Sequence, residues 1–172
     1  MFILVTGGSG SGKSAFAEDQ ILQFGDGVRI YIATMKNADV ESKRRIERHR
    51  RMRQDKCFET VEQYVSIKDL DIPEGSILLL ECMSNLVANE MYDENGAGRN
   101  TVKEILEGIR HLKKKSAHFV VVTNEIFSDG REYDKETMRY QKYLGSINQE
   151  LALMADRVVE VVYGIPVYLE NR

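Results

Sequence analysis

The chain has 172 residues, of which 42% are hydrophobic and 30% charged, and its formal net charge is −3. This composition is typical of a compact globular domain, and the net negative charge argues against a general affinity for nucleic acid. Two cysteines without metal-ligand spacing exclude a disulfide framework, and we expect both to be small buried residues or inert thiols. No apolar run approaches the roughly 20 residues of a membrane span, so the sequence predicts a single cytoplasmic domain over residues 1–172.

Short apolar runs alternate with longer stretches of helical periodicity, which is typical of βαβ units around a parallel sheet. In chain order the pattern predicts a strand at 2–6, a helix at 13–24, a strand at 28–33, a charged helix at 39–56 and a short strand at 58–62. Next come a buried strand at 77–80, a helix at 83–92, a loop at 93–100, a helix at 101–115 and a buried strand at 118–123. A long amphipathic helix at 134–155 precedes strands at 157–163 and 167–169, which Gly164-Ile165-Pro166 joins as a closing antiparallel hairpin.

The segment between the first strand and the first helix reads GGSGSGKS and matches G-x-x-x-x-G-K-[ST]. Glycines let backbone N–H groups converge on phosphate oxygens, and the helix that follows adds the positive end of its dipole. We therefore expect Lys13 to reach the β and γ phosphates of a nucleotide and the Ser14 hydroxyl to ligate Mg²⁺. The predicted phosphate loop comprises Gly7, Gly8, Ser9, Gly10, Ser11, Gly12, Lys13 and Ser14.

A P-loop usually works with an acid at the end of a neighbouring buried strand, and the run ILLLE supplies Glu81 at that position. Its carboxylate is a candidate ligand for Mg²⁺, or alternatively stabilises the first turn of the helix that follows. Asn124 and Glu125 end the next buried strand in the same way.

The helix at 39–56 concentrates positive charge. Residues 41–56 hold eight Lys or Arg and three Asp or Glu, a local charge of +5, so the rest of the chain carries −8. Arg45, His49 and Arg53 are four residues apart and share one face. Positive neighbours favour a neutral imidazole, which is a nucleophile that could attack an α-phosphate and release pyrophosphate. The alternatives are a solvated cationic face and a contact to nucleic acid, although the helix lacks interleaved aromatic residues.

Six stretches together resemble one family over nearly the whole chain. They are ILVTGGSGSGKS at 3–14, YIAT at 31–34, RIERH at 45–49, LLLEC at 78–82, VVTNE at 121–125 and LGSINQELALMADRVVEVVYGIP at 144–166. The family is the bifunctional adenosylcobinamide kinase / adenosylcobinamide-phosphate guanylyltransferase of cobalamin biosynthesis. The resemblance implies phosphorylation of adenosylcobinamide with ATP or GTP, followed by transfer of GMP from GTP through a guanylylated histidine.

The resemblance also implies a RecA-like P-loop fold, a homotrimer and particular site residues, while Mg²⁺ as cofactor follows from the phosphate loop itself. The guanylylated histidine falls on His49, while His111 and His118 match nothing catalytic. Beyond the phosphate loop, the implied nucleotide contacts are Ala33, Thr34, Met35, Arg50, Arg51, Met52, Arg53, Glu62 and Glu81.

One stretch departs from the family pattern. After VTNE many members have a glycine-rich segment ending in proline, whereas this chain has IFSDGREY at 126–133. The altered loop bears on the corrinoid contacts and on the kinase step, and leaves the assignments of His49 and the phosphate loop unaffected. A separate alternative is a small-molecule kinase that acts only with ATP, in which His49 only orders its helix. A nucleotide-dependent module that handles nucleic acid through Arg44 to Arg53 is a further alternative.

Overall fold

The computed structural model describes residues 1–37, 39–127 and 133–169, without the side chain of Met52. Within them a seven-stranded sheet has the order β3-β2-β4-β5-β1-β6-β7. The strands are β1 (Phe2–Thr6), β2 (Arg29–Ala33), β3 (Phe58–Glu62), β4 (Ile77–Glu81), β5 (His118–Val122), β6 (Arg157–Val162) and β7 (Ile165–Leu169). Neighbouring strands are parallel except for β6 and β7, which are antiparallel, so the predicted α/β fold with a closing hairpin is confirmed.

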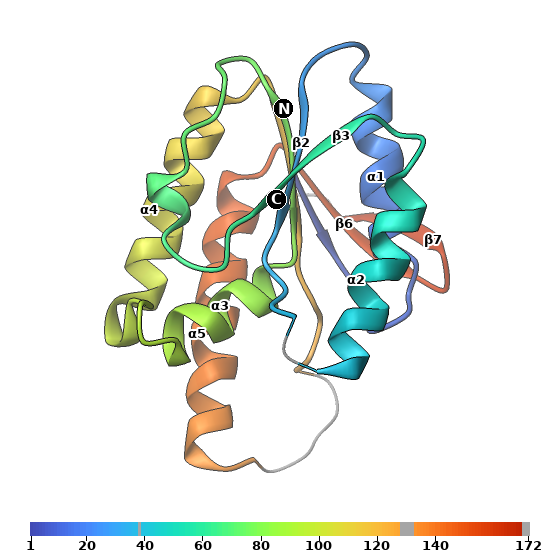
Figure 1. The fold of residues 1–172 in the computed structure, drawn as a ribbon. Coiled ribbons are helices and arrows are strands. Elements are labelled where there is room, and N and C mark those ends of the chain that lie inside the picture. The colour runs from blue at the N-terminus through green and yellow to red at the C-terminus, as the bar shows by residue number, and fades with distance from the viewer. Residues whose placement is uncertain (38, 128–132, 170–172) are drawn as a thin grey trace.

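Helices cover both faces of the sheet, as Figure 1 shows. Helices α3 (Met83–Tyr92), α4 (Thr101–Lys115) and α5 (Lys135–Met154) lie on one side, and α1 (Lys13–Gln23) and α2 (Val40–Arg53) on the other. Because both faces are covered, the central strands are apolar at nearly every position. Phe2 and Leu4 pack toward α3–α5, whereas Ile3 and Val5 pack toward α1.

The long amphipathic helix α5 packs as its sequence pattern predicts. Leu144, Ile147 and Leu151 are fully buried, and Tyr140 and Met154 are partly buried against the same core. Two short 3₁₀ helices, Ile67–Asp69 and Gly98–Asn100, were not expected from the sequence. Of the described helices, none is long and apolar enough to cross a bilayer.

The boundaries of two elements differ from the prediction by more than one residue, for local reasons. Helix α2 ends at Arg53 rather than Lys56, because the chain turns through Cys57, whose φ is 54°. The closing hairpin turns at Tyr163-Gly164 rather than at 164–166, since Val162 pairs with Ile165. Both turn residues have positive φ, 51° and 80°, as a two-residue hairpin loop requires.

The parallel strands bring the predicted site together at one edge of the sheet. The carboxyl end of β1 leads into the phosphate loop, that of β4 carries Glu81, and that of β2 carries Ala33 beside it in register. Ligands bind in open α/β sheets at such carboxyl ends.

Candidate active site

The phosphate loop packs tightly against β6 and the closing hairpin. A Cβ atom on Gly7 would lie 2.6 Å from the carbonyl oxygen of Val161, so only glycine fits. Gly12 is the N-cap of α1 and has a φ of 93°, in the left-handed region that favours glycine. The Lys13 ammonium, only 9% exposed, donates to the carbonyl of Gly8 at 3.0 Å. Burial lowers the pKa of Lys13, although the nearby Glu81 carboxylate acts in the opposite direction.

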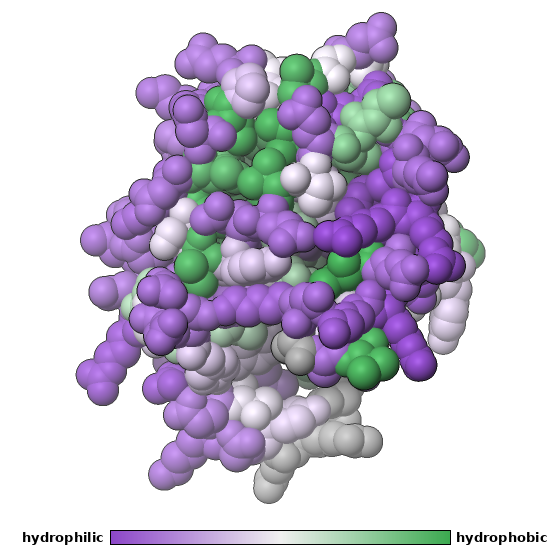
Figure 2. Space-filling model, viewed as in Figure 1, coloured by the Kyte–Doolittle hydropathy of each residue, from purple (hydrophilic) through white to green (hydrophobic). Residues whose placement is uncertain are grey.

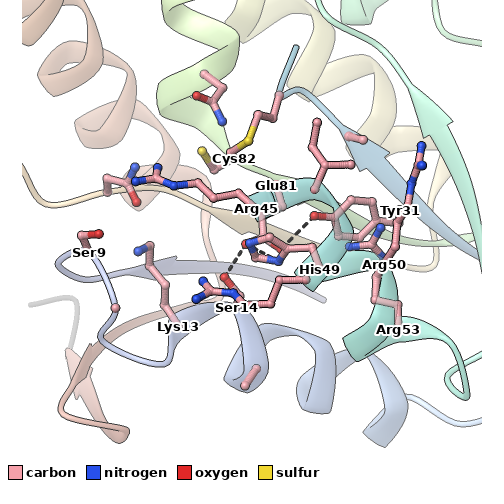
Figure 3. A pocket seen from close by; sticks show the side chains of 18 of the residues that line it. Ser9, Lys13, Ser14, Tyr31, Arg45, His49, Arg50, Arg53, Glu81 and Cys82 are labelled. Carbon is pink, nitrogen blue, oxygen red and sulfur yellow. Dashed lines mark hydrogen bonds and ion pairs between the residues drawn. The ribbon is translucent and has the colours of Figure 1, made fainter. Parts of the chain in front are cut away.

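Glu81 accepts hydrogen bonds from side chains on two different elements, helix α1 and strand β2. The Ser14 hydroxyl donates to its Oε1 atom, and the Tyr31 hydroxyl donates to its Oε2 atom at 3.1 Å. Burial, together with the Glu81 carboxylate, raises the pKa of Tyr31 well above its ordinary value of 10.0. Tyr31 therefore stays a neutral donor, and Glu81 is fixed beside the phosphate-loop serine (Figure 3).

His49 lies over the same carboxylate. Its Nδ1 atom is 3.7 Å from Oε1 of Glu81, and its side chain is 14% exposed. Figure 3 shows His49 on α2 pointing into the space that Lys13 and Ser14 also face. Nδ1 is buried and has no hydrogen-bond partner among the described residues. In the sequence, the helix face of His49 carries the positive charges of Arg45 and Arg53, whereas the fold adds an acceptor that can orient the ring.

Arg53 anchors the end of α2 on an aromatic ring. Its guanidinium carbon lies 3.4 Å from the centre of the Tyr31 ring, and the residue is 6% exposed. A guanidinium stacked on an aromatic face is stabilised by the ring quadrupole and by the apolar contact. The Arg53–Tyr31 stack therefore continues the Tyr31–Glu81–Ser14 chain of contacts out to α2.

These residues line one pocket of about 550 Å³, large enough for a nucleotide. The predicted site residues on its wall are Ser9, Gly10, Ser11, Gly12, Lys13, Ser14, Ala33, Met35, His49, Arg50, Arg53, Glu62 and Glu81. The elements that supply them are the phosphate loop, the ends of β2, β3 and β4, and one face of α2.

Four of the predicted site residues that the structure describes do not line this pocket. Gly7 and Gly8 support the phosphate loop through their carbonyl groups, which accept from Glu125 N and Lys13 Nζ. Thr34 is fully buried and joins the ends of β2 and β4, because its hydroxyl donates to the carbonyl of Cys82 at 2.8 Å. Arg51 is exposed and pairs with Glu47 at 2.6 Å. The side chain of Met52 lies outside the described part of the chain.

The pocket also includes residues that the sequence did not single out, among them Tyr31, Thr60 and Asn85. Tyr31 had a usable signal, because a tyrosine in a buried strand needs a hydrogen-bond partner for its hydroxyl. Asn124, noted as the end of a buried strand, lines the pocket and donates to the Ser84 hydroxyl at 2.6 Å. Thr60 and Asn85 had no such signal, since their places on the pocket wall depend on how segments distant in the sequence pack together.

Two groupings of side chains could hold a cation. Ser14 and Glu81 offer oxygen ligands in direct contact with each other, which suits Mg²⁺. The second grouping consists of three atoms that all lie within 4.8 Å of one another: a carboxylate oxygen of Glu18, a ring nitrogen of His49 and a carboxylate oxygen of Glu81. Lys56 already compensates the charge of Glu18 at 2.7 Å, so the second grouping is less suited to a metal ion.

The other histidines and the cysteines lie in ordinary environments. His118 begins β5 and stacks on Phe24, with ring centres 4.0 Å apart, and neither it nor His111 lines the pocket. Cys57 is exposed, contrary to a buried position, whereas Cys82 lines the pocket. Burial raises the pKa of the Cys82 thiol, even though the hydrogen bond with Ser84 opposes that effect.

The site is built from a strand, a glycine-rich loop and a helix, which together hold a buried lysine and a serine against a carboxylate at a strand end. This arrangement defines a P-loop nucleotide-binding protein. The fold is similar to that of a KaiC-like protein from Pyrococcus horikoshii OT3, with a TM-score of 0.50 and 14% identity over 92% of this chain and 71% of that one. It is also similar to an ATPase of the type III secretion system of pathogenic bacteria, with a TM-score of 0.54 and 9% identity over 97% of this chain and 56% of that one.

The chain belongs to the family described as cobinamide kinase / cobinamide phosphate guanyltransferase, which matches residues 3–169. Two relatives share the name "Bifunctional adenosylcobalamin biosynthesis protein CobU". The one from Escherichia coli (strain K12) is 35% identical over 99% of this chain and 100% of its own length. The one from Salmonella typhimurium (strain LT2) is 32% identical over the same shares of the two chains. The resemblance noted in the sequence is thereby confirmed.

Proposed function

We propose that this chain, as a single P-loop catalytic domain over residues 1–172, carries both activities for which its family is named. The first is phosphorylation of adenosylcobinamide with ATP or GTP. The second is transfer of GMP from GTP to adenosylcobinamide phosphate, in cobalamin biosynthesis or salvage. The family match over residues 3–169 and the single pocket that holds both a phosphate loop and His49 support the proposal.

The phosphorylation step uses the phosphate loop. Lys13 and the loop amides neutralise the negative charge that develops on the transferring γ-phosphoryl group. We propose that Ser14 and Glu81 hold Mg²⁺, which would supply further charge neutralisation. The acceptor hydroxyl of the corrinoid attacks the γ-phosphorus, and the bond from that phosphorus to the β-phosphate bridging oxygen breaks.

The guanylyl-transfer step uses His49. A ring nitrogen attacks the α-phosphorus of GTP, an N–P bond forms, and the bond to the β-phosphate bridging oxygen breaks to release pyrophosphate. Lys13 and the arginines of α2 stabilise the pyrophosphate as it leaves. A phosphate oxygen of adenosylcobinamide phosphate then attacks the same phosphorus, and the N–P bond breaks to return free His49.

One observation carries this proposal. The Nδ1 atom of His49 lies 3.7 Å from the Glu81 carboxylate, and Glu81 also contacts Ser14 of the phosphate loop. The test is incubation with Mg²⁺ and GTP labelled at its α-phosphate. We expect acid-labile label on the wild-type protein and none on His49→Ala, which should keep its kinase activity. Label that persists in His49→Ala would overturn the assignment.

The same assay separates the two alternatives. A kinase without guanylyl transfer would phosphorylate adenosylcobinamide and form no covalent nucleotide adduct. The loop at 126–133, which departs from the family pattern, bears on the corrinoid contacts and on the kinase step, and its residues 128–132 lie outside the described part of the chain. A nucleic-acid module would bind DNA or RNA with a steep dependence on salt concentration.

We also propose a cytoplasmic homotrimer. Strand β7 is an edge strand with an apolar exposed surface, which supports burial against another subunit. The exposed apolar residues of the β6–β7 hairpin are Val162, Tyr163, Ile165, Val167, Tyr168 and Leu169. Light scattering of the purified protein would test the number of subunits.

A further inference from the structure

Helix α2 carries His49 but has little apolar contact with the rest of the molecule. Of its residues whose side chains are described, only Arg53 is buried. Figure 2 shows hydrophilic side chains gathered over α2, in the orientation of Figure 1. Most surface helices are held by an apolar face, so α2 must be held in place by polar contacts instead.

Besides the stack of Arg53 on Tyr31, the described contacts between the α2 region and the body of the protein involve carboxylates on three other elements. Arg50 pairs with Glu62 of β3 at 3.0 Å, but both side chains are about half exposed. His49 faces Glu81 of β4 at 3.7 Å. Lys56, just beyond the helix, donates to Glu18 of α1 at 2.7 Å. A half-exposed pair stabilises little, so the Lys56–Glu18 pair is the ion pair that, together with the Arg53–Tyr31 stack, holds the C-terminal end of α2.

Glu18 is a fully buried carboxylate, with 0% exposure, one helical turn after Ser14. Its Oε2 atom accepts from Lys56, and its Oε1 atom has no hydrogen-bond partner among the described residues. Burial raises the pKa of Glu18, whereas Lys56 and Arg53 oppose that effect and Glu81 adds to it. The charge on Glu18 therefore depends on cations that α2 and its C-terminal turn bring to it.

The Glu18–Lys56 pair is linked directly to the helix that bears the histidine. The backbone N–H of Lys56 donates to the carbonyl of Arg53 at 3.0 Å, which fixes Lys56 to the last turn of α2. Removing one partner of a buried ion pair leaves the other charge uncompensated in a poorly solvated site. Loss of Glu18 would therefore loosen the C-terminal end of α2 against α1.

We propose that Glu18 is a positioning residue for guanylyl transfer, which acts through Lys56 to hold α2 and His49 against the phosphate loop. Glu18 does not line the nucleotide pocket, so it has no direct contact with the phosphates there. The phosphorylation step needs the phosphate loop and not His49. The two activities should therefore respond differently to the loss of Glu18.

The inference rests on the proposed role of His49, and its test compares both half-reactions in Glu18→Gln. We expect the single-turnover rate of guanylylation to fall by about 10- to 100-fold, because a displacement of about 1 Å is enough for such a loss. The kinase kcat should fall much less, since the kinase step does not use His49. Glu18→Asp, which keeps the charge, should recover part of the guanylylation rate.

Asp19→Asn is the matched control. Asp19 is the next residue, carries the same charge and lies 3.5 Å from the same Lys56 ammonium, but its side chain is 63% exposed. We expect this variant to keep both activities, because exposed ion pairs contribute little. Lys56→Gln tests the same pair from the other side and should also lower guanylylation selectively, which keeps the test available if Glu18→Gln fails to fold.

Two results would overturn the positioning role. One is an equal loss of both activities in Glu18→Gln and Lys56→Gln, and the other is an unchanged guanylylation rate in either variant. The His49→Ala variant separates this failure from that of the proposed function. If His49→Ala still forms the covalent adduct, the assignment of His49 is wrong. If His49→Ala forms none and Glu18→Gln guanylylates normally, only the role of Glu18 is wrong.

Discussion

The Nδ1 atom of His49 lies 3.7 Å from the Oε1 atom of Glu81, and that same oxygen accepts the hydrogen bond of the Ser14 hydroxyl. One carboxylate thus joins the phosphate loop to the helix that carries the proposed nucleophile. A single site can then serve two reactions at different phosphorus atoms of a bound nucleotide.

Glu81→Gln keeps the shape of the side chain and removes its charge. Because Glu81 contacts Ser14 and faces His49, we expect both kinase and guanylyl-transfer rates to fall by about 100-fold. Steady-state assays of each half-reaction at saturating Mg²⁺ would measure this. Glu59→Gln, at an exposed position of β3, makes the same change in charge and should leave both rates unchanged. A loss confined to one reaction would contradict the shared role.

Lys13→Ala removes the buried ammonium that faces the pocket. We expect both activities to decrease by about 100-fold or more, since the charge on the transferring phosphoryl group and on pyrophosphate is no longer neutralised. Nucleotide binding, followed by calorimetry, should weaken as well. Lys43→Ala changes an exposed lysine of α2 and serves as the control. Full activity of Lys13→Ala in either assay would be incompatible with the site described above.

Tyr31→Phe removes the hydroxyl that donates to Glu81. A buried hydrogen bond to a charged group stabilises by about 2 kcal/mol, so the free energy of unfolding should decrease by that order. The pKa of Tyr31 is raised in the folded state, so its contribution is complete below pH 10.0 and is lost as the pH rises through the folded-state pKa. Urea denaturation at several alkaline pH values should show the two proteins converging. Tyr168→Phe, at an exposed position, should not change stability.

Asp39→Ala removes the N-cap of α2. The backbone N–H of Ser42 donates to Asp39, and this contact holds the pKa of the Asp39 carboxyl below its ordinary value of 3.8. A lowered pKa contributes stability that is present above 3.8 and is lost as the pH falls through the folded-state value. We expect wild type to be more stable than Asp39→Ala at neutral pH, with a difference that shrinks below that value. Denaturation curves at neutral and acidic pH would detect it, and a constant difference would argue against the cap.

The two cysteines should differ in reactivity toward a thiol reagent. Burial raises the pKa of Cys82, which lowers its thiolate fraction near neutral pH, whereas Cys57 is exposed. We expect rapid modification of one thiol and slow modification of the other in the folded protein. Peptide mapping after brief alkylation would identify Cys57 as the fast site. Equal modification rates for Cys57 and Cys82 would show that the Cys82 thiol is more accessible than the structure indicates.

Much of the fold follows from local sequence. The apolar run of β1, the glycines after it and the helix from Lys13 specify a P-loop with no reference to other segments. The alternation of buried runs and amphipathic helices, such as the Leu144, Ile147 and Leu151 stripe, predicts the α/β class for the same reason, since each pattern is a property of neighbouring residues.

The tertiary structure alone decided which distant groups meet at the site. Nothing local to Glu18 or Thr60 says that either lies near the pocket or beneath α2, because these positions depend on the strand order β3-β2-β4 and on where a mostly polar helix docks. Residue type and spacing are enough to predict the phosphate loop and the charged helix with His49, because both are patterns of neighbouring residues. The contact between His49 and Glu81, 32 positions apart in the printed sequence, required the packed chain, because only folding brings a strand end and a separate helix within reach of each other.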